Sequence, residues 1–156
     1  NVGMRLSKVR AEGGPQASLL ALAGLRRLEL EQEAGVILDP ETMVPAACQG
    51  IVGVTVRADD VELRELLSVI EDRESAIASA AERALLGELD GSCRTPIGGH
   101  ARLTADGGVQ LTGLVARADG SFLLKRRLDG AAADAARLGR ELAMELRKNA
   151  PADVFG

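Results

Sequence analysis

The segment LDGSCRTPIGG, residues 89–99, places a cysteine among small, polar and turn-forming residues. A cysteine more often behaves as a small buried hydrophobe. As a thiolate, Cys93 is a nucleophile, and the adjacent Arg94 together with partial solvent access favours that form. The small neighbours also let a bulky group approach the sulfur. From the residues alone, a reactive thiol and an inert thiol at a helix-to-strand turn both remain open.

Arginines offer a second kind of chemistry, because a guanidinium binds carboxylates through paired, charge-assisted hydrogen bonds. Arg5 lies on an expected first helix, and Arg27 lies on the helix that follows an expected buried strand. Helix starts beyond the carboxyl ends of strands are common ligand sites in open α/β sheets. For these two residues, as for Arg10 and Arg26, a solvated helix face is the alternative.

The segment VPAACQG, residues 44–50, brings Gln49 and Gly50 just before an expected strand, where they form either a hinge or a strand-entry turn. The glycines around Cys93 lack the spacing of a phosphate-binding loop. His100 is the one histidine and is expected to be structural or on the surface. One histidine and two cysteines do not provide a histidine-based metal site or a disulfide framework.

The composition narrows the class of protein. A chain of 156 residues suffices for one domain or two small ones. Aromatic residues make up 1% and the net charge is -4, which argues against stacking on bases and against nucleic-acid binding. The longest apolar run, residues 17–25, is shorter than the roughly 20 residues that a membrane span needs. We therefore expect a cytoplasmic protein with neither a nucleic-acid nor a membrane partner.

The apolar pattern predicts a strand-then-helix unit followed by a different kind of domain. The N-terminal part alternates strand and helix, the building block of α/β folds. Near the C-terminus, ADGG and ADG are hairpin signals between three antiparallel strands. We expect an α/β portion followed by a small α+β domain with a three-stranded antiparallel sheet and helices. The predicted helices are 2–10, 22–35, 59–72, 73–89 and 131–149, and the predicted strands are 17–21, 51–58, 98–105, 109–117 and 121–128.

Four ordered segments resemble the porphobilinogen deaminase family, whose members are also called hydroxymethylbilane synthases. NVGMRLSK resembles the family's RGNVGTRLxK, and LLALAGLRRL resembles ILAxAGLxRL. VPAACQGIVGV resembles LPAxGQGAxGI, and ERALLGELDGSCRTPIG resembles ERAxLxxLxGGCxxPIG. The resemblance covers almost the whole chain. The first segment lacks the leading Arg-Gly, so we expect the chain to be the C-terminal half of a longer protein.

The resemblance implies a cofactor and the residues that hold it. In the family, the cysteine matched by Cys93 carries a dipyrromethane primer through a thioether bond. Arg5 and Arg27 match arginines of the cleft that bind pyrrole acetates and propionates, whereas Arg10 and Arg26 match none and are expected to be surface residues. The positions that match the lining of the cofactor are Leu20, Ala21 and Gln49.

The resemblance also implies a reaction: the stepwise condensation of four porphobilinogen molecules, with loss of ammonia, into hydroxymethylbilane. The catalytic aspartate is expected in an N-terminal part of the same enzyme, so we expect no catalytic residue in this portion and no activity from it alone. The complete enzyme is expected to be monomeric. Two other classes stay open, namely a non-enzymatic carboxylate-binding module that leaves Cys93 free and a thiol-redox sensor.

The resemblance divides the chain into three parts. Residues 1–50 are expected to end a second α/β domain of the periplasmic-binding-protein type. Residues 51–71 are expected to return to a first domain, and residues 72–156 to form a complete C-terminal domain. The strand 51–58 would then lack its sheet, and unpaired strand edges invite association. The isolated chain is therefore expected to dimerise or to need its missing half.

Three positions depart from the family pattern. Gln16 stands where the family usually has Asp, which puts a polar contact before the buried strand in doubt. Ser92 replaces a Gly before the cofactor cysteine, a mild change. Cys48 also replaces a usual Gly, and it is expected to make the turn at that position less permissive.

Overall fold

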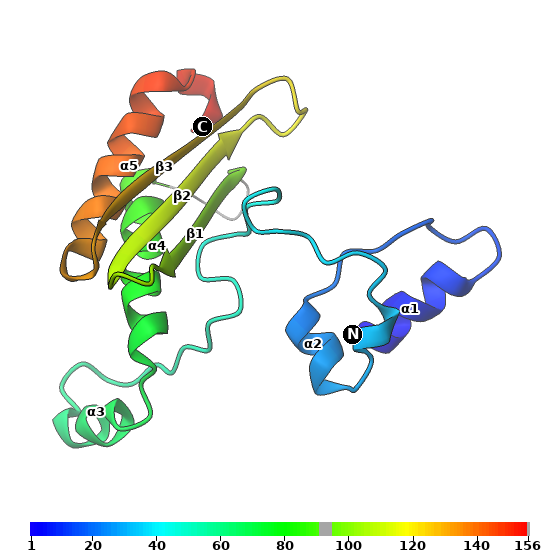
Figure 1. Ribbon diagram of the computed structural model, residues 1–156, viewed down its shortest axis with the longest axis horizontal. Helices are drawn as coiled ribbons and strands as arrows, with labels where there is room; N and C mark the ends of the chain where they lie inside the picture. The colour runs from blue at the N-terminus through cyan, green and yellow to red at the C-terminus, as the bar shows by residue number, and fades with distance from the viewer. Residues whose placement is uncertain (91–94, 156) are drawn as a thin grey trace. The chain divides into compact units, whose positions relative to one another are not determined.

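The computed structural model describes residues 1–90 and 95–155 (Figure 1). Contacts between residues divide the chain into two units, Asn1–Asp39 and Pro40–Gly156, and each is described by itself.

The first unit contains two short α-helices, α1 (Val2–Arg10) and α2 (Leu22–Arg27), and a 3-10 turn, η1 (Glu31–Glu33). Helix α1 agrees with the prediction, and the Asn1 side chain caps it by accepting a hydrogen bond from the Met4 N–H. Of residues 1–39, all of which are described, only Leu25 is buried. The unit therefore has almost no apolar core of its own.

The predicted helix 22–35 is wrong beyond Arg27, because a left-handed residue ends α2 early. Glu29 has a φ of 57°. The N–H of Leu30 donates to the carbonyl of Leu25 at 2.9 Å, and the N–H of Glu29 donates to the carbonyl of Arg26 at 3.0 Å. This pair of hydrogen bonds is the Schellman motif, which usually has glycine at the left-handed position. Because this position holds a glutamate and not a glycine, the sequence does not carry the usual signal for a helix end there.

Two predicted strands, 17–21 and 51–58, are also wrong. Neither segment forms a ladder, and most of their residues are exposed. A strand needs a neighbour to satisfy its N–H and C=O groups, and no described strand lies beside either segment. Their β-branched or apolar composition therefore does not by itself produce a strand in this chain.

The second unit contains the other elements, and their order agrees with the prediction. Asp60 and Asp72 cap α3 and α4 by accepting hydrogen bonds from backbone N–H groups. β3 extends three residues past its predicted end before α5 begins. The elements are α3 (Val61–Ser68), α4 (Arg73–Glu88), β1 (Ile97–Leu103), β2 (Gly108–Ala116), β3 (Leu123–Ala131), η2 (Ala132–Asp134), α5 (Ala135–Asn149) and η3 (Ala152–Val154).

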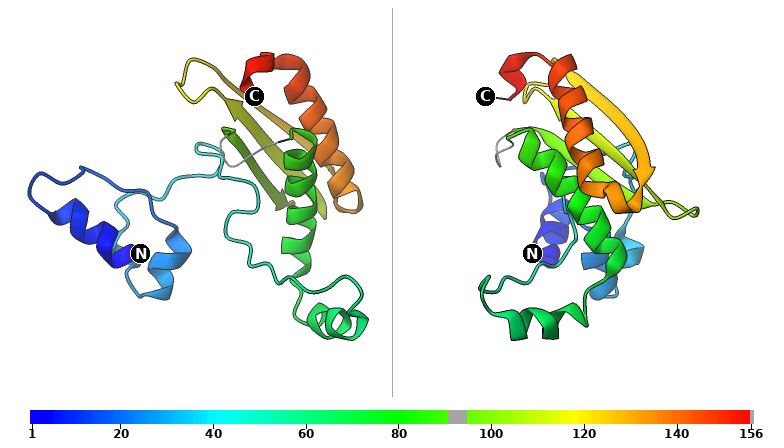
Figure 2. Two further views of the ribbon diagram at one scale, coloured as in Figure 1. Left: turned by 180° about the vertical axis from the view of Figure 1, so that it is seen from behind. Right: turned by 90° about the vertical axis from the view of Figure 1, so that its left-hand side faces the viewer.

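The three strands form an antiparallel sheet in the order β1-β2-β3, as predicted. Helices α4 and α5 lie side by side against one face of it (Figure 2). Fully buried side chains from both helices and the central strand fill the space between these layers, namely Leu85, Leu89, Val109, Leu111, Val115, Leu142 and Leu146. No helix among the described residues is long and apolar enough to span a membrane.

Candidate cofactor-binding site

Cys93, the predicted attachment residue, lies outside the described residues, but both ends of its segment are described. On one side, Leu89 at the end of α4 is fully buried, and Arg147 of α5 donates to the carbonyl of Glu88 at 2.9 Å. On the other side, the Pro96 carbonyl accepts a hydrogen bond from the N–H of Ala116 at 3.0 Å. The core of the C-terminal domain therefore fixes the backbone at residues 88–89 and at Pro96.

A second predicted segment lies directly against β1. We call residues 41–48 the strap. Its Pro45 carbonyl accepts a hydrogen bond from the N–H of Gly99 at 2.9 Å. A β carbon at position 98 would lie 3.0 Å from Val44 Cγ1, and one at position 99 would lie 3.1 Å from Leu85 Cδ2. Gly98 therefore leaves room for the strap, whereas Gly99 leaves room for Leu85 of α4.

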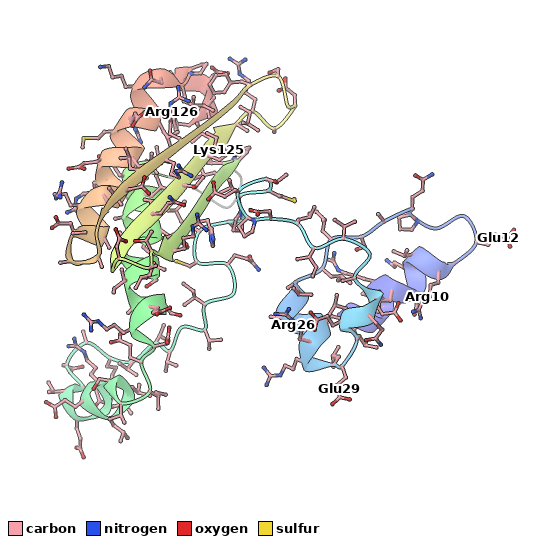
Figure 3. All side chains as sticks on the ribbon, in the orientation of Figure 1. Arg10, Glu12, Arg26, Glu29, Lys125 and Arg126 are labelled. Carbon is pink, nitrogen blue, oxygen red and sulfur yellow. The ribbon has the colours of Figure 1, made fainter. Side chains whose placement is uncertain are left out.

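The other end of the strap is fixed on the face of the sheet opposite the helices. The Thr112 hydroxyl donates to the Glu41 carboxylate at 2.9 Å, and the Lys125 ammonium donates to the Glu41 carbonyl at 2.6 Å. Lys125 is labelled on β3 in Figure 3. The next residue, Arg126, pairs instead with Glu145 of α5 at 3.4 Å. Because successive side chains of a strand point to opposite faces of the sheet, Lys125 faces the strap and Arg126 faces α5.

The strap ends in a turn that contains a left-handed cysteine. Cys48 has a φ of 62°, and the N–H of Gln49 donates to the Ala46 carbonyl at 3.1 Å. A positive φ at the third residue is what a type II turn requires, and glycine is preferred there. The geometry agrees with the expectation that replacing the family's glycine makes this turn less permissive.

A buried carboxylate holds the same turn. Glu82 of α4 is 4% exposed. Its Oε2 accepts a hydrogen bond from the N–H of Cys48 at 2.5 Å, and its Oε1 accepts one from the N–H of Ala101 at 2.6 Å. Sequence inspection missed Glu82, although its position offered a signal. It lies four residues after Ala78 and three before Leu85, on the face of α4 that packs into the core.

The environment of Cys48 makes its thiol a poor nucleophile. Burial raises the pKa of this thiol, the negative charge of Glu82 raises it further, and Arg83 opposes them. At neutral pH the group therefore stays protonated, and the protonated thiol is not the reactive form.

Gln49, predicted to line the cofactor, is the last residue of this turn and is exposed. The N–H of Ile51 donates to the Cys48 carbonyl at 3.1 Å and closes a second turn behind it. Two successive turns therefore fix the backbone around Gln49, and its side chain is exposed.

In the first unit, the structure brings Arg5 to the predicted lining segment. The Arg5 guanidinium donates to the Leu19 carbonyl at 3.5 Å. Leu20, the next residue, is half-buried, and Ala21 is the N-cap of α2. Arg5, Leu20 and Ala21 therefore lie around the start of α2. Gln49 belongs to the second unit, so its relation to these three residues stays a prediction.

The arginines of the first unit separate into paired and unpaired residues. Arg26 donates two hydrogen bonds to Glu31, at 2.9 and 2.8 Å, which hold the pKa of that carboxyl below its usual range. Arg10 pairs with Glu33 at 2.6 Å. Both cations are labelled in Figure 3. Within the described ranges, neither Arg5 nor Arg27 has an acidic partner, so these two stay available for a ligand's carboxylates.

The arrangement first defines a class: a small α+β domain, with two helices against one face of a three-stranded antiparallel sheet, preceded by a helical unit that has almost no core of its own. Comparison with known proteins then gives the family. Residues 1–65 match the model described as porphobilinogen deaminase, dipyromethane cofactor binding domain, and residues 76–148 match the model of the porphobilinogen deaminase C-terminal domain. The chain belongs to the porphobilinogen deaminase family and corresponds to its C-terminal portion.

Individual relatives agree with the two models. The chain is 47% identical over 155 residues to a porphobilinogen deaminase of Paracoccus denitrificans, covering 99% of this chain and 49% of the relative. It is 43% identical over 155 residues to that of Nitrobacter winogradskyi, covering 99% and 48%. It is also 43% identical over 146 residues to that of Syntrophobacter fumaroxidans, covering 94% and 47%. The chain thus spans about half the length of the curated relatives it matches.

Proposed function

We propose that this chain is the C-terminal half of an enzyme that condenses four porphobilinogen molecules, with loss of ammonia, into hydroxymethylbilane. One observation carries the proposal beyond the family match. The strap that leads into Gln49 packs on Gly98 and Gly99, which follow Cys93 closely in the sequence. Two segments that resemble separate cofactor-binding motifs thus meet at one place on the domain.

The described residues fit dipyrromethane by their chemistry. The group carries carboxylates, and Arg5 and Arg27 are guanidiniums without an acidic partner in the part of the chain that the structure describes. Arginine binds carboxylates through paired hydrogen bonds. In the proposed complex these two residues bind the carboxylates, and the lining residues are Leu20, Ala21 and Gln49. When bound, dipyrromethane supplies the pyrrole end to which further units add.

Cys93 is proposed to hold the cofactor through a thioether. Its thiolate attacks the methylene carbon that becomes electrophilic when porphobilinogen loses ammonia, so a carbon–sulfur bond replaces the carbon–nitrogen bond. The raised pKa of Cys48 supports the choice of Cys93 as the attachment residue, because the Cys48 thiol stays protonated at neutral pH. The attachment needs a free thiol, so a reducing, cytoplasmic setting is part of the proposal.

We further propose the division into residues 1–50, 51–71 and 72–156, with the middle part belonging to the first domain of the complete enzyme. Val52, Val54, Val69 and Ile70 are all exposed large hydrophobic residues. Several of them line a hollow of about 1040 Å³ between residues 50–56, α3 and the start of α4. Such an apolar surface suits a missing partner, and the N-terminal part of the same polypeptide is the proposed one.

Reconstitution tests the proposal. The chain alone, the N-terminal portion alone and their mixture are assayed for hydroxymethylbilane, with the complete monomeric enzyme as the positive control. We expect no product from the chain alone, because the catalytic aspartate is assigned to the other portion, and product from the complete enzyme. Product from the chain alone would contradict the assignment of a half-enzyme. An inactive complete enzyme would contradict the function itself.

A further inference from the structure

The outer edge of β1 is closed by two different groups, and Glu82 is one of them. The N–H groups of Gly99 and Ala101 point to the same edge, because alternate residues of a strand share a side. The first donates to the Pro45 carbonyl of the strap at 2.9 Å, and the second donates to Glu82 Oε1 at 2.6 Å. Because Glu82 Oε2 also accepts from Cys48 of the strap, one carboxylate joins the strand edge to the strap.

This bridge requires a carboxylate specifically. Both partners are N–H donors, so both oxygens of Glu82 act as acceptors. A glutamine offers one acceptor oxygen and would place its NH₂ against the other donor. Glu82 is 4% exposed, and no described cation forms an ion pair with it. Burying such a charge is costly unless hydrogen bonds compensate, and an apolar side chain would fill the same core position without that cost.

We propose that Glu82 is a positioning residue whose carboxylate fixes the left-handed turn at Cys48 and, through it, the side chain of Gln49. The inference rests on the proposed function, in which Gln49 lines the cofactor. Gln49 is the residue directly after the bonded N–H, and its own N–H closes the same turn on Ala46 at 3.1 Å. A glycine-preferring conformation held by a cysteine needs an external constraint, and Glu82 supplies one.

Amide hydrogen exchange on the purified chain tests the structural half of the proposal. In Glu82→Gln we expect the backbone amides of Cys48 and Gln49, whose N–H groups bond to Glu82 and to Ala46, to exchange about tenfold faster or more, since a lost hydrogen bond to a charged group has at least that effect. Thr112→Val is the matched control because it removes a hydrogen bond from the opposite end of the strap. Its exchange at the amides of Cys48 and Gln49 should equal that of the wild type. Equal exchange in Glu82→Gln and the wild type would overturn the proposal.

A double-mutant cycle in the complete enzyme tests the functional half. Gln49→Ala and Glu82→Gln should each lower kcat/KM by about tenfold, and their combination should be little worse than either, because one residue acts through the other. Thr112→Val should lower the melting temperature without this loss of kcat/KM. Additive effects of Glu82→Gln and Gln49→Ala, or a loss in Thr112→Val equal to that in Glu82→Gln, would overturn the proposal.

Two further comparisons distinguish a folding defect of Glu82→Gln, and a failure of the proposed function, from a failure of the proposal about Glu82. If Glu82→Gln is poorly folded, it is placed in a Gly87→Ala background, because a β carbon at position 87 of α4 meets nothing within 4 Å and alanine favours a helix. Failure of the proposed function is visible separately, since the wild-type complete enzyme would then carry no adduct on Cys93. The exchange measurement reports on Glu82 in either case.

Discussion

Gly139 of α5 faces Ala81 of α4 so closely that a β carbon at position 139 would overlap the Ala81 carbonyl oxygen. The same β carbon would lie 2.8 Å from the Ala84 β carbon and 2.9 Å from the Leu85 nitrogen. Two of these atoms belong to the backbone of α4, so a rotamer change cannot relieve the overlap. The contact sets how closely α4, which precedes Cys93 in the sequence, approaches α5.

Gly139→Ala should therefore destabilise the C-terminal domain by about 2–3 kcal/mol, in the upper part of the range for overpacking. Gly87→Ala is the matched control in α4, where the added β carbon meets nothing within 4 Å. It should stabilise by about 0.5–1 kcal/mol through helix propensity. Urea unfolding followed by circular dichroism measures both changes. A Gly139→Ala variant as stable as the wild type would contradict the close approach of the two helices.

Much of the C-terminal domain could be predicted from the sequence because its signals are local. The turn segments ADGG and ADG carry glycines with φ values of 82° and 75°, at Gly107 and Gly120, and they separate the three strands as predicted. The spacing of apolar residues over 73–89 likewise predicted both ends of α4 to within one residue. Hairpin turns and amphipathic helices depend on neighbouring residues, so a single sequence contains the information.

The errors fall where structure depends on groups distant in the sequence. Residues 51–58 have the composition of a strand but no neighbouring strand in the described chain. Glu29 adopts a conformation that usually marks glycine, so α2 ended before its predicted end. Glu82 was not singled out from the sequence, because its two hydrogen-bond partners lie at Cys48 and Ala101, far along the chain. The site residues follow from the family resemblance, and the contacts that position them required the structure.

The reactivity of Cys48 should depend on pH in a defined direction. Burial first, and Glu82 second, raise the pKa of this thiol, so its thiolate forms only at a higher pH than that of an unperturbed cysteine. In the Cys93→Ser variant, Cys48 is the only thiol. Its rate of alkylation by iodoacetamide should therefore reach half its maximum at a higher pH than that of a cysteine peptide. A midpoint at or below that of the peptide would contradict the prediction.

The arginines of the first unit should differ in their effect on catalysis. Arg5→Leu and Arg27→Leu in the complete enzyme should each impair primer assembly or elongation by about tenfold or more, since losing a charged hydrogen bond costs roughly 1.5–3 kcal/mol. Arg26→Leu is the control because that cation is already paired with Glu31. It should leave elongation unchanged, and melting temperatures should move little in all three. A large loss of stability with normal elongation would instead indicate that Arg5 and Arg27 support the fold.

Intact mass spectrometry of the complete enzyme tests the central claim, that Cys93 holds dipyrromethane through a thioether. The wild type and Cys48→Ser should both carry the mass of two pyrrole units, and a thiol reductant should not remove it because a thioether is not a disulfide. Cys93→Ser should lack the added mass, since a hydroxyl is a far weaker nucleophile than a thiolate. An adduct that persists in Cys93→Ser, or that reductant releases from the wild type, would contradict the account.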